Sequence, residues 1–226
     1  MNEYSFIKSV IPVRRSIITT KDKNNKYHLI LEAAVKVFAR QGFFHSTVSQ
    51  IAKEAGVADG TIYLYFKNKD DILVQFFSYK TKQVFEKFRE EVGRMDNAIG
   101  KLRKLICLHL EEFQRNRDMA IVYQVETHQN SRLAEAQIKA MSKMYFDIIS
   151  EIVEQGQAQG TIRKELYMGL VKRFIIGAVD EVINTWLHSD GKYDLVSMAD
   201  PLAELFIRGI GSDGGATGND FSAVRG

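Results

Sequence analysis

Apolar residues recur at helical spacing along most of this 226-residue chain. Residues 26–41 place Ile30, Ala34 and Phe38 on one face, which predicts an amphipathic helix. The same period predicts further helices at residues 68–93, 97–115, 118–128, 131–159, 165–188 and 197–209. Proline, which interrupts helices, occurs at only two positions. The pattern therefore predicts an all-α protein.

Short polar residues mark where some of these helices should begin. Asn68 suits an N-cap, because its side chain can accept a hydrogen bond from a free backbone N–H of the first turn. Asp200 suits the cap of the last helix, with Pro201 at the first helical position. Residues 1–22 show no clear period and predict a flexible arm. Residues 211–226 are glycine-rich and polar, which predicts a disordered tail.

One segment departs from the long helices. Residues 47–69, TVSQIAKEAGVADGTIYLYFKNK, contain two short predicted helices on either side of a tight turn. Gly56 lies at the turn, where glycine can adopt a positive φ without a penalty from Cβ. In the second helix, Ile62 and Phe66 lie four residues apart and should face inward, which leaves hydroxyl and phenol groups outside. This is the pattern of a helix-turn-helix unit, whose second helix enters the major groove of DNA.

The outward residues of this unit suit contacts with nucleic acid. Gly60 lets the backbone approach the groove closely, and Thr61 can bond a phosphate or a base edge. The phenols of Tyr63 and Tyr65 can donate to phosphate oxygens, and Lys69 offers a cation. Half-buried packing is the alternative for the two tyrosines, and a solvated surface for Lys69. The candidate DNA-contacting residues are Thr47, Ser49, Gly60, Thr61, Tyr63, Tyr65 and Lys69.

Charge adds modest support for a DNA-binding end. Residues 1–80 hold 12 Lys and Arg against 7 Asp and Glu, whereas residues 81–226 hold 19 against 21. A basic N-terminal part therefore precedes a slightly acidic body, within a net charge of +3. This asymmetry fits a DNA-binding head on a body that has another task.

Signs of other chemistry are sparse. The five histidines form no metal-spaced pair, and the chain has no phosphate-binding glycine loop and no G-x-S-x-G motif. We therefore expect no catalytic residues, no metal and no cofactor, and His109 should be a hydrogen-bonded core residue. Cys107 is the single cysteine, which excludes an internal disulfide and fits a cytoplasmic protein. Apolar runs are too short for a membrane span of about 18 residues.

The 47–69 stretch resembles the DNA-binding signature of the TetR family of bacterial repressors almost position for position. In that family, the positions that match Thr47, Thr61, Tyr63 and Lys69 contact DNA. The resemblance implies an N-terminal three-helix DNA-binding domain and a C-terminal helical domain for ligand binding and dimerisation. We assign these to residues 23–70 and 71–210. It also implies a homodimer, formed by the last two long helices at 165–188 and 197–209, on a near-palindromic operator.

A second stretch narrows the resemblance. Residues 180–196, DEVINTWLHSDGKYDLV, are similar to the effector domain of family members that repress fatty-acid degradation genes and respond to long-chain acyl-CoA. This implies a long-chain fatty acyl-CoA as effector. Apolar and aromatic residues would line its acyl tunnel, with arginines for the phosphates of CoA. The candidate ligand-binding residues are Phe113, Arg115, Arg117, Tyr123, Arg132, Met144, Ile148, Phe174, Val179 and Trp186.

Three alternatives remain open at this point. The effector of a TetR-type repressor could be another hydrophobic or drug-like molecule. The helix-turn-helix could serve protein contacts in a ligand-binding or scaffolding protein, in which case DNA binding that depends on salt would be absent. Catalysis is the third alternative, and a metal or a strongly perturbed carboxylate pair would favour it.

Overall fold

The computed structural model describes residues 20–128 and 134–211 of the chain. This described part contains nine α-helices, one 3-10 helix and no strand, which confirms the predicted all-α fold. The helices are α1 Thr20–Gln41, α2 Val48–Glu54, α3 Asp59–Ile62, α4 Lys69–Gly93, α5 Ala98–Arg115, α6 Arg117–His128, α7 Glu135–Ala158, α8 Met168–His188, η1 Val196–Met198 and α9 Ala199–Ile210.

Polar caps define the starts of α4 and α5, close to where they are predicted. The Asn68 side chain accepts from the backbone N–H of Asp71 at 2.8 Å, and the Asn97 side chain accepts from that of Gly100 at 2.8 Å. Each bond satisfies a first-turn N–H that has no partner inside the helix. The helix predicted at residues 68–93 is therefore confirmed as α4, Lys69–Gly93.

Other helix starts differ from prediction. Helix α1 begins at Thr20, so the predicted arm at 1–22 is wrong at its last three residues, and residues 1–19 lie outside the described part. Helix α8 begins at Met168, three residues after its predicted start at residue 165. The N-cap of α9 is Met198 and not Asp200. Pro201 is accommodated in the first turn, because the N–H groups there need no intrahelical partner.

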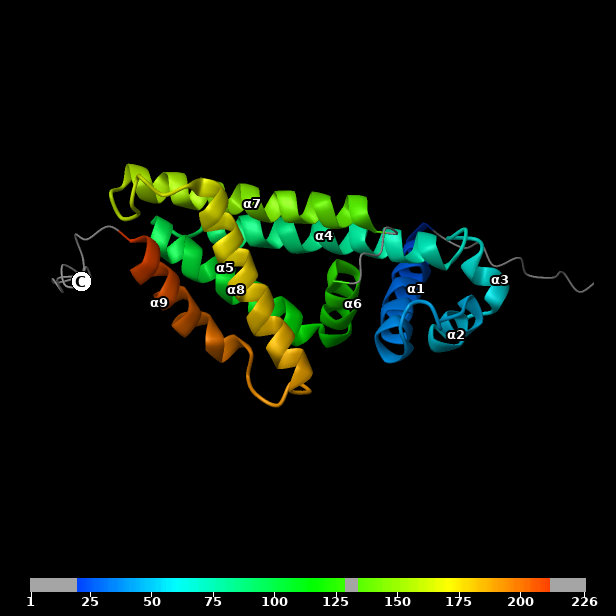
Figure 1. Cartoon of the computed structure of the whole chain (residues 1–226). Helices are drawn as coiled ribbons and strands as arrows, with labels where there is room; N and C mark the ends of the chain where they lie inside the picture. The colour runs from blue at the N-terminus through cyan, green and yellow to red at the C-terminus, as the bar shows by residue number, and fades with distance from the viewer. Residues whose placement is uncertain (1–19, 129–133, 212–226) are drawn as a thin grey trace, which may run out of the picture.

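The molecule is elongated, with helices α1, α2 and α3 gathered at one end (Figure 1). Helix α4 leaves this head and runs beside α7 along the body. Helix α8 crosses the body diagonally, and α9 lies at the end away from the head. A single helix, α4, thus belongs to both the head and the body.

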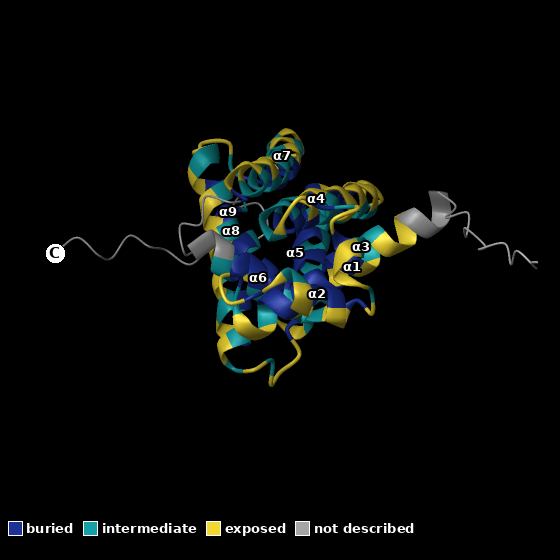
Figure 2. Cartoon of the chain, turned by 90° about the vertical axis from the view of Figure 1, so that its right-hand side faces the viewer, coloured by how far each residue is buried: buried dark blue, intermediate teal, exposed yellow. Residues whose placement is uncertain are grey.

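Helix α5 is the centre of the body. It packs against α4, α6, α7, α8 and α9, and its buried residues lie on several of its faces. Figure 2 shows buried residues on the inner sides of the helices and exposed residues on their outer sides. Burial of apolar side chains around α5 is therefore the main force that holds the body together.

Candidate DNA-binding and effector sites

The turn between α2 and α3 has the geometry that the sequence predicts. Thr47 caps α2: its Oγ1 accepts from the backbone N–H of Gln50 at 3.2 Å, while the Gln50 side chain accepts from the backbone N–H of Thr47 at 2.8 Å. Gly56 has φ of +65°. The N–H groups of Gly56 and Val57 bond back to the carbonyls of Lys53 and Ala52, at 3.2 and 2.9 Å. This helix end is a Schellman motif, which requires the left-handed conformation that glycine adopts freely.

The outer surface after this turn is polar, aromatic and open. Ile62 and Phe66 are buried, as predicted, whereas Tyr63 is 60% exposed and Leu64 is 76% exposed. Regular helix ends at Ile62, and turns at residues 63–65 continue the chain. Thr47, Ser49 and Gly60 are also exposed, while Thr61 and Tyr65 are half-buried. Six of the seven predicted DNA contacts therefore lie where a ligand could reach them.

Lys69 has a structural role that the sequence did not indicate. Its Nζ donates to the carbonyl oxygens of Phe43, Phe44 and Ser46, at 2.8, 3.0 and 3.0 Å, and lies 4.6 Å from the centre of the Phe43 ring. All three ammonium hydrogens therefore have partners. Lys69 holds the loop before α2, and a phosphate contact would have to displace one of these bonds.

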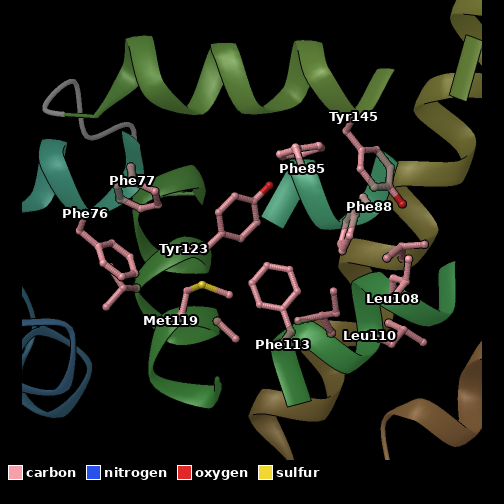
Figure 3. Packing of buried hydrophobic residues seen from close by; sticks show 14 of the residues in the cluster. Phe76, Phe77, Phe85, Phe88, Leu108, Leu110, Phe113, Met119, Tyr123 and Tyr145 are labelled. Atoms are coloured by element: carbon pink, nitrogen blue, oxygen red, sulfur yellow. The ribbon is translucent and has the colours of Figure 1, made fainter. Parts of the chain in front are cut away.

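Beyond the head, the body contains an elongated cavity. Only about 60 Å³ of it is open to a water-sized molecule, well below the roughly 300–1,000 Å³ of ordinary small-molecule sites. Figure 3 shows Phe85, Phe113 and Tyr123 facing one another from α4, α5 and α6. The cavity is lined by Phe76, Phe77, Lys80, Thr81, Val84, Phe85, Phe88, His109, Glu112, Phe113, Met119, Tyr123, Met141, Ser142, Tyr145 and Ile176.

A buried polar pair lies at one end of the cavity. His109 Nδ1 and Tyr145 Oη are 3.1 Å apart, and both side chains are buried. Burial lowers the pKa of His109 to about 3, because the imidazolium loses its hydration. Burial likewise raises the pKa of the Tyr145 phenol, and the negative charge of Asp180 adds to that effect. Both groups are therefore neutral at pH 7, and the predicted hydrogen-bonded core histidine is confirmed.

The other end of the cavity meets a polar cleft between head and body. Phe76, Lys80 and Met119 line both spaces. The cleft has a volume of about 890 Å³, including open solvent. Its charged residues are the bases Lys36, Lys80, Arg115 and Arg117 and the acids Glu32 and Asp118. A basic vestibule thus adjoins an apolar chamber and shares three lining residues with it, an arrangement that fits an anionic head and a hydrophobic tail.

The structure brings together only some of the predicted ligand-binding residues. Phe113 and Tyr123 line the cavity, and Arg115 and Arg117 line the cleft at its mouth. Arg132 lies outside the described residues. Five predicted residues lie elsewhere: Met144, Ile148, Phe174, Val179 and Trp186 do not line the cavity.

These five residues have other surroundings, and Met144 is half-buried against the core. The Trp186 indole N–H donates to the carbonyl of Tyr193 at 2.9 Å, which ties α8 to the following loop. Val179 is fully buried core, and Ile148 borders a separate groove beside Arg89. Phe174 is 51% exposed on the outer side of α8. Helical period alone did not separate these positions from those facing the cavity.

Sequence reasoning missed the largest wall of the cavity. Helix α4 contributes an aromatic stripe, Phe76, Phe77, Phe85 and Phe88, which the period identifies only as an inward face. A signal was present, since four phenylalanines fall within residues 76–88 of a single predicted helix. The position of Lys80 and Thr81 within that stripe was a second signal.

Comparison with known proteins decides the family. Residues 30–76 match the family model of bacterial regulatory proteins of the tetR family, and residues 77–209 match that of the C-terminal region of YsiA-like proteins. The chain belongs to the TetR family of bacterial regulators. The helix-turn-helix of this TetR-family chain is thus its DNA-binding unit, and the proteins it resembles are transcriptional regulators.

Individual relatives narrow the comparison. The chain is 40% identical to the fatty acid metabolism regulator protein of Bacillus subtilis, over 84% of this chain and 98% of that protein. The crystal structure of Bacillus subtilis FadR in complex with stearoyl-CoA superposes with a TM-score of 0.76 at 40% identity, covering 81% of this chain and 99% of that one. Bacillus halodurans FadR gives a TM-score of 0.77 at 36% identity, with 81% and 95% covered.

Two further features concern the described residues alone. Among them, no group of three or more His, Cys, Asp or Glu side chains is placed to hold a metal ion. None of their helices combines the length and the apolar character that a membrane crossing requires.

Proposed function

We propose that this protein is a transcriptional repressor of fatty-acid metabolism genes in the cytoplasm, and that a long-chain fatty acyl-CoA releases it from its operator. One observation carries this proposal: an apolar cavity in the body adjoins a basic cleft beside the head, and the two share three lining residues. The similarity to a regulator crystallised with stearoyl-CoA supports the same ligand class.

The two spaces suit the two halves of an acyl-CoA. Aromatic and methionine side chains of the cavity provide an apolar, adaptable wall for an acyl chain. The cavity is narrow, so these side chains must change rotamers to admit a long chain. Lys36, Lys80, Arg115 and Arg117 provide cations for the CoA phosphates. Free fatty acid lacks those phosphates and should bind more weakly.

DNA binding is assigned to residues 23–70, and effector binding and dimerisation to residues 71–210. Within the head, we propose that six residues face the operator, because each is exposed or half-buried: Thr47, Ser49, Gly60, Thr61, Tyr63 and Tyr65. Lys69 supports them by holding the loop before α2.

A homodimer through α8 and α9 is part of the proposal. Leu170 and Phe174 on α8 are 64% and 51% exposed, and Leu205 on α9 is 67% exposed. Exposed apolar residues that cluster on adjacent helices favour a protein interface. Gly177, also exposed on α8, would let a partner helix approach closely. Two heads held about one DNA turn apart, roughly 34–36 Å, would read a near-palindromic operator.

Helix α4 gives a route from effector to DNA. Its first turn carries Lys69, which holds the head, and residues 76–88 line the cavity. Helix α1 of the head packs against α6, whose Met119 and Tyr123 form another wall. Widening the cavity would displace α4 and α6 and alter the spacing of the two heads. The effector acts only through its higher affinity for this second state.

The test is fluorescence anisotropy of the protein on DNA from its own upstream region, titrated with palmitoyl-CoA or stearoyl-CoA. We expect tight binding that the acyl-CoA reverses and free fatty acid does not. Tight binding without release would reject the effector and favour another hydrophobic ligand, and absence of specific binding would reject this DNA as the operator.

A matched pair of lysines on α4 sharpens this test. Lys80 lines both the cavity and the cleft, whereas Lys82 is 77% exposed and pairs with Glu86. Lys80→Ala should raise the acyl-CoA concentration needed for half-maximal release, by about tenfold for one charged contact. Lys82→Ala should leave it unchanged, and equal effects would indicate nonspecific charge attraction.

A further inference from the structure

One polar group inside the cavity lacks a hydrogen-bond partner. Thr81 is 9% exposed and lines the cavity, yet its Oγ1 makes no hydrogen bond. Buried hydroxyls are normally bonded. Serines in comparable helical positions follow that rule: Ser78 donates to the carbonyl of Val74, and Ser150 to that of Phe146, both at 2.9 Å. Thr81 forgoes this local bond, which leaves its hydroxyl available to a ligand.

The other buried polar groups along this wall have partners inside the protein. His109 and Tyr145 bond each other. Glu112 accepts from the Asn116 side chain at 2.7 Å and lies 3.7 Å from Arg115. Thr81 thus differs from them, since its hydroxyl makes no hydrogen bond while their polar atoms bond within the protein.

The position of Thr81 indicates which part of a ligand it would meet. It follows Lys80, which lies where the cavity joins the basic cleft. The rest of the wall leads from Phe76 and Phe77 at this mouth to Phe88 and Tyr145 at the far end (Figure 3). Thr81 is therefore a polar group near the boundary between vestibule and chamber, about one helical turn inside Phe77.

We infer that the Thr81 hydroxyl donates a hydrogen bond to the thioester carbonyl of the effector, which makes Thr81 a specificity-determining residue. This inference rests on the proposed acyl-CoA effector and deepens it. In such a ligand, the carbonyl stands between the polar CoA arm and the apolar chain, as Thr81 stands between cleft and chamber. The carboxylate of Glu112 lines the same cavity, so a neutral carbonyl is favoured there over the charged carboxylate of a free acid.

The test compares two ligands that differ only at this carbonyl. Palmitoyl-CoA carries it, and S-hexadecyl-CoA has a methylene in its place. Calorimetric titration of the wild-type protein should show palmitoyl-CoA binding about three- to tenfold more tightly, which corresponds to one neutral hydrogen bond. Thr81→Val, which replaces the hydroxyl with a methyl group, should bind both ligands equally.

Two further variants exclude a merely structural effect. Thr81→Ser keeps the hydroxyl and should keep the preference for the thioester. Ser78→Ala removes a hydroxyl that is bonded locally on the exposed side of α4, and this variant should also prefer the thioester ligand. Without ligand, Thr81→Val should unfold at the same temperature as wild type or higher, because it removes an unsatisfied buried group.

The outcomes separate this inference from the proposed function. If Thr81→Val retains the preference, or if wild type binds both CoA ligands equally, Thr81 is not the carbonyl partner and the acyl-CoA effector stands. If wild type binds neither CoA ligand, both the effector and the role of Thr81 are overturned.

Discussion

Tyr63 offers the most direct residue-level test of the DNA interface. Its ring is 60% exposed, so Tyr63→Phe removes one O–H without opening a cavity. If that O–H donates to a phosphate, operator affinity should fall by about tenfold or more, because hydrogen bonds to charged groups are strong. Anisotropy measures the loss, and Tyr193→Phe in the body is the control. Unchanged affinity would remove Tyr63 from the interface.

Lys69 should matter more for stability than for DNA affinity. Lys69→Met keeps the aliphatic stem but loses three hydrogen bonds and the contact with the Phe43 ring, which should destabilise the head by about 2–4 kcal/mol. Urea denaturation measures this loss. The direct contact predicted from the sequence is correct if stability is unchanged and operator binding depends less steeply on salt. The slope of log affinity against log salt concentration should then fall by about 0.9, the value for one phosphate contact.

His109 predicts a specific acid sensitivity. The folded state lowers the pKa of this imidazole to about 3, so only the unfolded chain gains the proton between pH 6.5 and 3. The contribution of neutral His109 to the free energy of unfolding is therefore fully present above about pH 6.5. It falls as the pH decreases, by up to about 1.4 kcal/mol per pH unit. His109→Gln should remove this part of the pH dependence of stability, as measured by urea denaturation at several pH values between 6.5 and 3. An identical slope would show that other groups cause the acid sensitivity.

At the scale of elements, two glycines of the helix-turn-helix should respond in opposite ways. A Cβ added at either position would meet no atom within 4 Å, so backbone conformation and DNA decide the outcome. Gly56 has φ of +65°, and Gly56→Ala should cost about 1 kcal/mol of stability. Gly60 lies in α3, where Gly60→Ala should stabilise by about 0.5 kcal/mol yet weaken operator binding. Thermal unfolding and anisotropy on the same samples measure both effects, and unweakened binding by Gly60→Ala would show that no close approach occurs there.

Helix boundaries can be predicted from the sequence only where they depend on neighbouring residues. Asn68 is predictable as a cap because the bond it makes depends only on the next turn. The start of α9 is not predictable in this way, since by sequence alone Asp200 is as suitable a cap as Asn68, yet the N-cap is Met198. There the 3-10 turn at Val196–Met198 continues directly into the helix, so the helical bonds begin before Asp200 is reached.

For the whole molecule, the exposed apolar residues of α8 and α9 predict an interface. Leu170→Glu and Leu205→Glu each place a charge on that surface without disturbing the core. Each variant should be monomeric by light scattering and should bind the operator much more weakly, because burying an unpaired carboxylate is costly. Leu29→Glu, an exposed leucine of the head, should remain dimeric. Dimers in both body variants would place the interface elsewhere.

The sequence by itself determined the features that depend on neighbouring residues. The caps at Thr47 and Asn68, the turn at Gly56 and the inward faces of Ile62 and Phe66 follow from local hydrogen bonding, allowed φ and helical period. Together they were sufficient for the all-α fold and the helix-turn-helix.

Only the tertiary structure decided which inward faces line a cavity. Phe85 and Val179 follow the same helical period, yet one borders the chamber and the other is packed core. Likewise, Lys69 meets three carbonyls from a loop more than twenty residues earlier in the chain. The physical reason is that period specifies the direction of a side chain, whereas its partner depends on how distant helices pack.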